Sequence, residues 1–238
     1  MKIKKIKEKA LKKLEGNYIT VILATLIFGL IIGIFTGVSQ LIYNNNMSAF
    51  FELIIIGLLY MGLLEITIKI ARGKKTKLSD LFNRTDLFWK SIAVTIIMST
   101  FTLLCTVLEI VAFKSLKAFT VYQTDMSPFI SGIMVIIGIL LCAAIATFYI
   151  TIMISCSQSY YILYENENMP VIDILNRSMD LMEYHRLDYI LYILSFLGWI
   201  VLGIVTFGLL FFWVSPYMMV SNVIFYDELV KLEKKEAK

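Results

Sequence analysis

Polar side chains inside long apolar stretches are the residues of this chain best placed to do chemistry. Glu52 and Glu109 lie near the predicted outer ends of two such stretches, and Gln158 and Asn222 lie within two others. A charge at mid-bilayer costs roughly 2.5–3.5 kcal/mol on insertion scales, so an acid kept there marks a function or a paired site. Glu52 and Glu109 could share a proton or line a cation path. Snorkelling or pairing with nearby lysines is the structural alternative.

A polar motif occurs twice at an offset of 93 residues (173 minus 80). The first copy contains Asp80, Asn83 and Arg84, and the second contains Asp173, Asn176 and Arg177. We expect each copy to be a short amphipathic helix before a membrane span, like the lysine-rich residues 1–15. The sequence therefore predicts three units, each an amphipathic helix followed by two spans, around an axis along the membrane normal.

The two arginines of this motif are candidates for binding lipid headgroups. A guanidinium fork suits phosphate, and Asn83 and Asn176 would accompany Arg84 and Arg177 at headgroup level. The structural alternative is that the arginines cap helix ends or pair with the aspartates of their own motif copies. A further local pair is expected between Glu65 and Lys69, four residues apart.

Small residues and a proline indicate how two of the spans pack. Gly29, Gly33 and Gly37 form two overlapping GxxxG motifs, a spacing that lets helix backbones approach closely. We expect this face to pack within the chain rather than against a second copy. Pro216 predicts a kink in the last span because proline removes a helix hydrogen bond.

Enzyme chemistry finds little support in the sequence. His185 is the single histidine, which excludes a HExxH zinc site, and the three cysteines lie singly in separate apolar stretches. No nucleophile elbow, phosphate-binding loop or dinucleotide fingerprint occurs. We expect no enzymatic activity, no cofactor, no metal and no nucleic-acid partner, since the basic residues are spread in a way that suits anionic lipid.

The composition is that of a membrane protein. Of the 238 residues 59% are hydrophobic and 17% are charged, against roughly 45–50% and about 25% in soluble domains. A charge-free run of about 18 or more apolar residues predicts a span. The sequence predicts one all-α domain over residues 1–238, with six spans near 18–40, 50–70, 91–113, 129–155, 189–205 and 209–226 and a tail at 227–238.

Several connections and bends follow from this assignment. Asn44, Asn45 and Asn46 are expected in a loop, as are residues 114–127, and Thr206-Phe207-Gly208 in a tight turn. The fourth span should be a tilted or kinked helix that continues beyond a polar stretch at residues 155–159. All of the 22 lysines and arginines except Lys114 and Lys117 fall on one side of this topology, so the positive-inside rule places both termini in the cytoplasm.

Landmark residues along the chain resemble one family of integral membrane proteins. They include Gly16-Asn17-Tyr18, Ala71-Arg72-Gly73, Leu81-Phe82, Asn176-Arg177-Ser178, His185-Arg186, Leu197-Gly198-Trp199, Thr206-Phe207-Gly208, Pro216-Tyr217 and Phe225-Tyr226. On these residues the chain resembles the uncharacterised family of Gram-positive bacteria catalogued as domain of unknown function nine-seven-five. The resemblance is densest from Glu165 to Glu228 and poor from Lys114 to Ile150. It implies a bacterial cell-membrane protein and no known reaction.

The leading hypothesis is a lipid- or partner-binding membrane factor of the bacterial envelope. Its partners would be an anionic leaflet, another membrane protein or a second copy of itself. The alternative is a small transporter or an export or immunity protein with a polar path lined by Glu52, Glu109, Gln158 and Asn222. A water-filled central cavity reaching Glu109 would favour transport, whereas a packed core with lateral grooves would favour binding.

Overall fold

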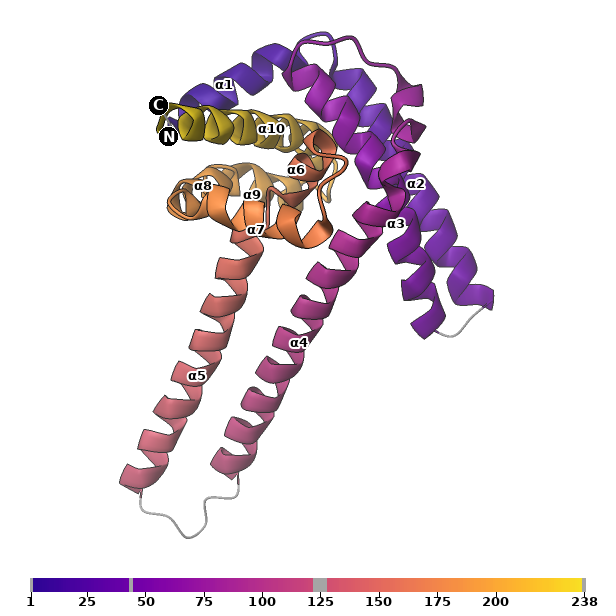
Figure 1. The fold of residues 1–238 in the computed structure, drawn as a ribbon. Helices are drawn as coiled ribbons and strands as arrows, with labels where there is room; N and C mark the ends of the chain where they lie inside the picture. Colours follow the sequence, from indigo (N-terminus) through magenta and orange to yellow (C-terminus); the bar gives the residue numbers. More distant parts are fainter. Residues whose placement is uncertain (1, 43–44, 122–127, 237–238) are drawn as a thin grey trace.

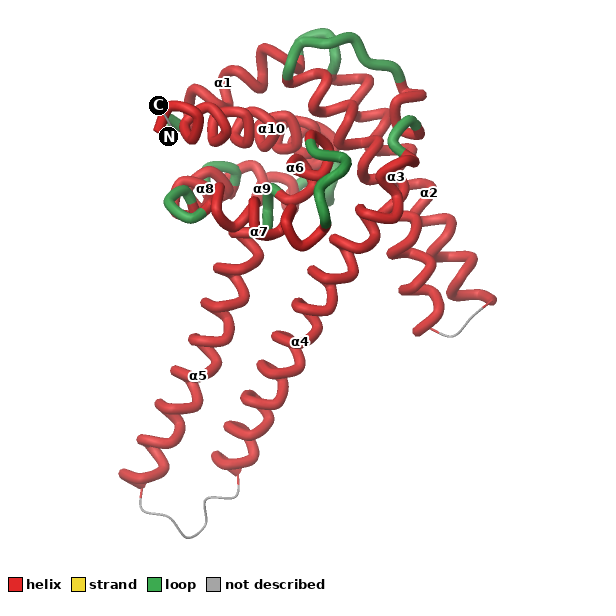
Figure 2. Tube along the Cα trace, in the orientation of Figure 1, coloured by secondary structure: helices red, strands yellow, loops and turns green. Residues whose placement is uncertain are grey.

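The computed structural model describes residues 2–42, 45–121 and 128–236, which form helices joined by short connections (Figures 1 and 2). Within these ranges no strand occurs, and the elements are α1 (Ile3–Leu14), α2 (Tyr18–Ile42), α3 (Asn45–Ala71), η1 (Leu78–Phe82), η2 (Thr85–Leu87), α4 (Phe88–Val121), α5 (Pro128–Ser155), α6 (Ser159–Glu165), α7 (Val171–Met182), α8 (Arg186–Leu194), α9 (Leu197–Val205) and α10 (Phe211–Glu236). Helices bond their own backbone groups, as a bilayer requires. The predicted all-α class is confirmed.

Four helical segments of the described residues are long and apolar enough to cross a membrane. They are Tyr18–Gln40, Leu78–Lys117, Phe129–Glu165 and Arg186–Val205. At most 17% of the residues in their most apolar windows are buried by protein. Apolar side chains left uncovered over such lengths fit contact with lipid, so these segments support a membrane protein.

Two predicted loops proved to be helical where the structure describes them. Asn45 and Asn46 belong to the first turn of α3, while Asn44 lies outside the described residues. Helix α4 continues through Lys114 and Lys117 to Val121 instead of ending near residue 113. Lysine is a good helix former, and its long side chain lets the ammonium group reach the headgroups while the backbone stays helical. The two lysines therefore do not end α4 where the loop was predicted.

The fourth span was predicted as a tilted or kinked helix that continues past residue 155, and the kinked form is found, because α5 ends at Ser155 and α6 begins at Ser159. The predicted span near 189–205 lies within the apolar segment Arg186–Val205. This segment has a break that was not predicted, because α8 ends at Leu194 and α9 begins at Leu197. The Ser195 hydroxyl donates to the carbonyl of Tyr192 at 2.6 Å, and such side-chain bonds compete with the helix ladder.

The turn between α9 and α10 is confirmed at its predicted place. Phe207 and Gly208 have φ values of 51° and 89°, which reverse the chain over two residues. Helix α10 then runs to Glu236 with Pro216 inside it, so the described part of the predicted tail from residue 227 is helical. The side chain of Phe207 is 98% exposed, as suits a turn at a membrane interface.

The first copy of the repeated motif forms two 3₁₀ helices, η1 and η2, instead of the amphipathic α-helix predicted there. The Asp80 carboxylate accepts the backbone N–H of Lys77 at 3.1 Å and the side-chain amide of Asn83 at 3.0 Å. These local bonds close a tight turn in place of a longer helix. The second copy, in α7, is an α-helix as predicted.

The packing of the helices follows a cycle around the molecule. Each predicted amphipathic segment packs on the helix that ends the preceding unit. Segment η1 packs on α3, and α7 packs on α6. Helix α1 packs on α10, so the first and last units are in contact and the three units form a closed ring. The two chain ends consequently lie side by side (Figure 1). We call α1, α6, α7, α8 and α10, with the parts of α3 and η1 packed on them, the helical body. The α2–α3 and α4–α5 hairpins extend from it in diverging directions (Figure 1).

The contact between α3 and η1 depends on one glycine. A Cβ atom at Gly62 would lie 1.8 Å from the carbonyl oxygen of Leu81, whose side chain is 1% exposed. The obstacle is backbone, so rotation of a side chain cannot relieve it. Gly33 is the opposite case, because no described atom would lie within 4 Å of a Cβ there.

We predict that Gly62→Ala destabilises the protein by about 3 kcal/mol or more, the upper part of the range for overpacking. Gly33→Ala is the matched control in a helix of the same hairpin and should keep the melting temperature of the wild type. The comparison is a thermal melt in detergent followed by circular dichroism. Equal melting temperatures for the two variants would contradict the close approach of η1 to α3.

Candidate functional site

A charged cluster centred on Arg72 joins the ends of α3 and α6 to α10. The Arg72 Nη2 atom lies 2.5 Å from Glu165 Oε1 at the end of α6 and 2.7 Å from Asp227 Oδ1 in α10. Its Nε donates to Asp227 Oδ2 at 3.4 Å, and the Tyr226 hydroxyl donates to Glu165 Oε2 at 2.7 Å. Arg72 and Glu165 are 93 residues apart, the offset of the repeated motif. The predicted units therefore meet at related positions.

The Arg72 cluster is only partly open to solvent. The side chains of Arg72, Glu165 and Asp227 are 29%, 30% and 24% exposed. Burial alone would lower the pKa of Arg72, but hydrogen bonds and charge interactions with the two carboxylates raise it overall. The guanidinium therefore stays charged, and the cluster acts as a structural tie.

A second cluster joins α3 to η1. Lys69 Nζ lies 2.6 Å from Glu65 Oε1, which confirms the predicted pair, and 3.0 Å from Asp80 Oδ2. Glu65 and Asp80 are 6% and 7% exposed. The Glu65 Oε2 atom is buried without a hydrogen-bond partner among the described residues. Burial of two carboxylates is tolerable here because one ammonium group serves both.

Arg84 pairs with acids other than the one suggested by the sequence. Its Nη2 lies 2.5 Å from Glu167 Oε1 and its Nε 3.7 Å from Asp86 Oδ1, while the guanidinium lies 4.7 Å from the centre of the Tyr164 ring. The expected pairing with Asp80 is wrong, since Asp80 is held by Lys69 and Asn83. Arg84 thus fastens η2 to the α6–α7 connection.

Arg177 likewise binds a distant acid. Both of its Nη atoms donate to the carboxylate of Glu233 in α10, and this pair replaces the expected one with Asp173. The hydrogen bonds that Arg177 donates to Glu233 raise the pKa of Arg177 against the opposing effect of burial. Asn176 beside it is exposed. Since both motif arginines hold carboxylates of the chain, their geometry favours the structural alternative over lipid phosphate.

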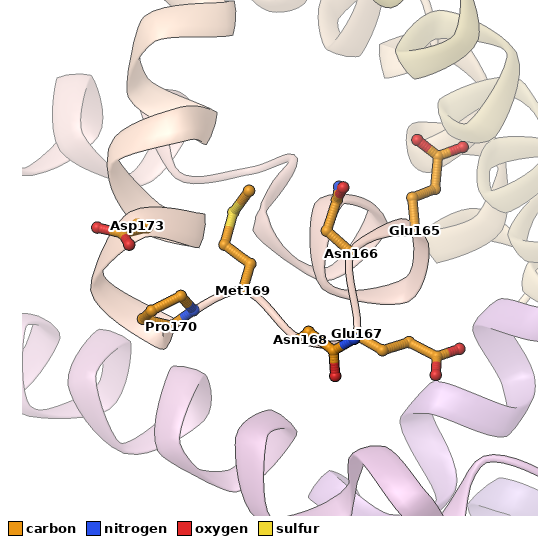
Figure 3. A pocket seen from close by; sticks show the side chains of 7 residues that line it. All are labelled: Glu165, Asn166, Glu167, Asn168, Met169, Pro170 and Asp173. Atoms are coloured by element: carbon orange, nitrogen blue, oxygen red, sulfur yellow. The ribbon is translucent and has the colours of Figure 1, made fainter.

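An acidic hollow of about 660 Å³ lies over the α6–α7 connection (Figure 3). The carboxylates of Glu165 and Glu167 do not face each other across it, because they point away toward Arg72 and Arg84 (Figure 3). Asp173 also points outward. In the part of the chain that the structure describes, no group of three or more His, Cys, Asp and Glu side chains could hold a metal ion.

Two of the predicted intramembrane polar residues belong to one buried network. Gln158, which is 0% exposed, donates from Nε2 to Ser157 Oγ at 2.8 Å. The Tyr189 side chain interacts with both Ser157 and Asn222. The Gln158 Oε1 and Asn222 Oδ1 atoms are buried and lack partners among the described residues. The structure thus brings Gln158 and Asn222 into one network, as a shared polar site would require.

The two predicted outer carboxylates are not brought together. Helices α3 and α4 are in contact at Gly57 and Ile92, and Glu109 lies about 25 Å farther along α4 at 1.5 Å per residue. Glu52 lies five residues from Gly57, about 8 Å along α3, and α3 and α4 diverge (Figure 1). The side chain of Glu52 is outside the described part. The predicted proton-sharing pair is therefore wrong, and Glu109 lies in a lateral groove near Lys114 and Lys117.

The glycine face of α2 is open. No described atom would lie within 4 Å of a Cβ placed at Gly29, Gly33 or Gly37. The expected packing of this face within the chain is thus not found among the described residues. The hairpin partner α3 contacts α2 on other positions, and the glycine face is turned outward.

A basic groove of about 480 Å³ lies between α1 and α10, a feature that the sequence analysis did not identify. Its rim carries Lys2, Lys5, Lys9 and Lys235, with Glu228, and its apolar lining is Ile6 and Leu232. Lys9 Nζ lies 2.8 Å from Glu228 Oε1 and holds the two helices together. The lysine-rich residues 1–15 indicated a basic surface, but the sequence does not show that α1 packs against α10 to form a groove.

Helix α1 is also fastened through a lysine that points inward. Lys7 Nζ donates to the carbonyl of Ser195 at 2.8 Å and lies 4.1 Å from the centre of the Phe196 ring. Burial lowers the pKa of Lys7. The ammonium satisfies a carbonyl at the break between α8 and α9, so α1 stabilises this break.

Comparison with known proteins agrees with the landmark residues. The family described as protein of unknown function (DUF975) matches residues 1–233, which confirms the resemblance inferred from the sequence. No curated protein and no solved structure matches the chain.

We predict that Arg72→Ala lowers the free energy of unfolding by about 2–3 kcal/mol, between the values for surface and buried ion pairs. The change leaves Glu165 and Asp227 without their common cation. Arg84→Ala is the matched control, because its partner Glu167 is 50% exposed, and it should cost less than about 1 kcal/mol. Equal losses, measured by denaturation in mixed micelles, would contradict the central role of Arg72.

A pH dependence follows from the pair between α1 and α10. The hydrogen bond from Lys9 lowers the pKa of Glu228 below that of an ordinary glutamate. The stabilisation is therefore complete above the pKa of the unfolded state and is lost as pH falls through the lower folded value. Melting temperatures of the wild type and Glu228→Gln should differ at pH 7 and converge below about pH 4. A difference that stays constant with pH would refute this assignment.

Proposed function

The chain belongs to the DUF975 family of proteins of unknown function, and from its packing and charge we propose a non-enzymatic membrane protein whose helical body binds anionic lipid. In this proposal α3 and α10 join the four apolar segments to make six spans. Both termini lie in the cytoplasm, in the membrane of a bacterial cell.

The position of the chain ends supports an even number of spans. Because α1 packs on α10, the two termini lie on the same side of the structure (Figure 1). The same side carries the groups that tie the units together, Arg72 and Lys69 among them. Positive charge gathers on the cytoplasmic face of membrane proteins, which supports the proposed orientation.

The basic groove between α1 and α10 is the observation that carries the lipid proposal. Four lysines surround an apolar lining. The lysines suit a lipid phosphate group, and the apolar lining suits the first carbon atoms of an acyl chain. The apolar face of α1 is occupied, since Ile6, Ala10 and Leu14 are buried in the body. Helix α1 therefore binds the leaflet through the charge of its lysines and does not insert its apolar face into the lipid. Each lysine near an anionic leaflet contributes about 1 kcal/mol to binding.

The packing favours binding over the transport alternative. Large aromatic side chains, among them Phe196 and Phe225 at 0% exposure, fill the helical body. The grooves that we describe are lateral, and Glu109 lies in one of them. A small transporter or an export or immunity protein would have to pass its cargo through the network of Gln158 and Asn222. That network is enclosed by packed tyrosines such as Tyr161 and Tyr189.

We predict that Lys2→Gln with Lys5→Gln weakens retention of phosphatidylglycerol about thirtyfold, which corresponds to about 2 kcal/mol for two lysines. The measurement is native mass spectrometry after stepwise delipidation, repeated at higher salt, where the effect should shrink. Lys74→Gln with Lys75→Gln, two exposed lysines of the α3–η1 connection, is the matched control. A control that loses as much lipid, or a wild type that keeps phosphatidylcholine equally well, would overturn the proposal.

A further inference from the structure

A second groove, of about 770 Å³, runs along the α4–α5 hairpin far from the basic groove. Phe113 on α4 and Ile139 on α5 are among its apolar walls, and Ala143 and Ala146 lie at its end nearer to Ser155. Lys114 and Lys117 lie at its other end, and Glu109 lies between the two ends, about 12 Å from Lys117 along α4. We call this feature the hairpin groove. It combines a charged end with an apolar trough, which a surface facing lipid tails alone would not need.

The length of the helices places the charged end at a membrane surface. Trp89, at the start of α4 beside the helical body, is 77% exposed, as suits an interfacial anchor. Lys114 lies about 38 Å farther along α4 at 1.5 Å per residue, somewhat more than the roughly 30 Å of a hydrocarbon core. Lys114 and Lys117 therefore reach the headgroups of the leaflet away from the body.

The apolar end of the hairpin groove reaches the middle of the bilayer. Ala146 lies about 14 Å along α5 from Ser155, where that helix leaves the body. The groove thus extends from mid-bilayer to one headgroup layer, which is the length of a single leaflet. Small side chains at Cys142, Ala143 and Ala146 leave room on α5 that larger residues would fill.

The charges at the outer end select the occupant. Two lysines and one glutamate give a net positive charge, which complements the single negative charge of a phosphodiester. Glu109 lies about 8 Å from Lys114 along α4, away from the membrane surface, so the two lysines and not Glu109 are nearest to the phosphate. A choline phospholipid has no net negative charge and gains less from the two lysines.

We infer that the hairpin groove binds one anionic phospholipid in the leaflet opposite the chain termini. Its phosphate contacts Lys114 and Lys117, and one acyl chain runs past Glu109 and lies over Ala143 and Ala146. This inference rests on the membrane-spanning placement of α4 and α5 in the proposed function. It concerns a different surface and a different leaflet from the basic groove.

The other face of the same hairpin supplies a matched control. A groove of about 470 Å³ lies there, lined by apolar side chains such as Ala112 and Leu141, with Ser115 and no charged residue. Such a trough can receive acyl chains but cannot distinguish headgroups. Ala112→Leu fills this face without altering the hairpin groove.

The test is native mass spectrometry with phosphatidylglycerol or phosphatidylcholine as the probe. Two double variants alter the hairpin groove: Lys114→Gln with Lys117→Gln removes its charge, and Ala143→Leu with Ala146→Leu fills its trough. Each should lose one phosphatidylglycerol per protomer, with at least about a tenfold weaker affinity. Ala112→Leu should keep that lipid. Lys2→Gln with Lys5→Gln should also keep it while losing lipid from the basic groove. The two sets of variants therefore test the two proposed lipid sites independently.

Cys142 provides a second readout, because it lines the hairpin groove and is a free thiol. Phosphatidylglycerol should slow its reaction with a maleimide in the wild type but not in Lys114→Gln with Lys117→Gln. Cys105 and Cys156 are buried and serve as internal references. Unchanged lipid retention in the lysine variant, equal retention of phosphatidylcholine, or no protection of Cys142 would each overturn the inference. The lysine variant decides the matter if the leucine variant does not fold.

Discussion

One guanidinium group ties the ends of α3 and α6 to the interior of α10, although these helices are far apart in the chain. Arg72 at the end of α3 binds Glu165 at the end of α6 and Asp227 in α10. A cation shared between two acids stabilises all three helices at once, because displacement of any one of them would leave an unpaired, partly buried charge. The segments η1, α7 and α1 pack on these same three helices, α3, α6 and α10 respectively.

Much of the architecture could be predicted because lipid imposes simple rules. Charge-free runs located α2 and α5, the length of the second run predicted a tilted or kinked helix there, and Thr206-Phe207-Gly208 located the last turn. The errors arose where one local interaction outweighs the pattern. Asp80 closes 3₁₀ turns, and Ser195 breaks a helix that apolar periodicity makes continuous. Periodicity does not record such single hydrogen bonds.

The candidate sites were harder to predict, because partner choice among charges depends on the fold. The repeated motif singled out Arg84 and Arg177, yet their partners Glu167 and Glu233 lie outside the motif. The basic groove requires lysines from both ends of the chain, and the hairpin groove requires a helix that continues past Lys114. Neither groove can be predicted from the sequence alone, because one requires α1 to pack on α10 and the other requires α4 to extend past Lys114.

The closed ring also sets an order for assembly during synthesis. Helix α1 is synthesised before α10, the helix that covers much of its buried face, and all the other described helices come between them. Ile6, Ala10 and Leu14 therefore lack this partner while the intervening helices are made. If the helical body binds anionic lipid as proposed, the lysines of α1 would hold that helix near the leaflet until α10 is available.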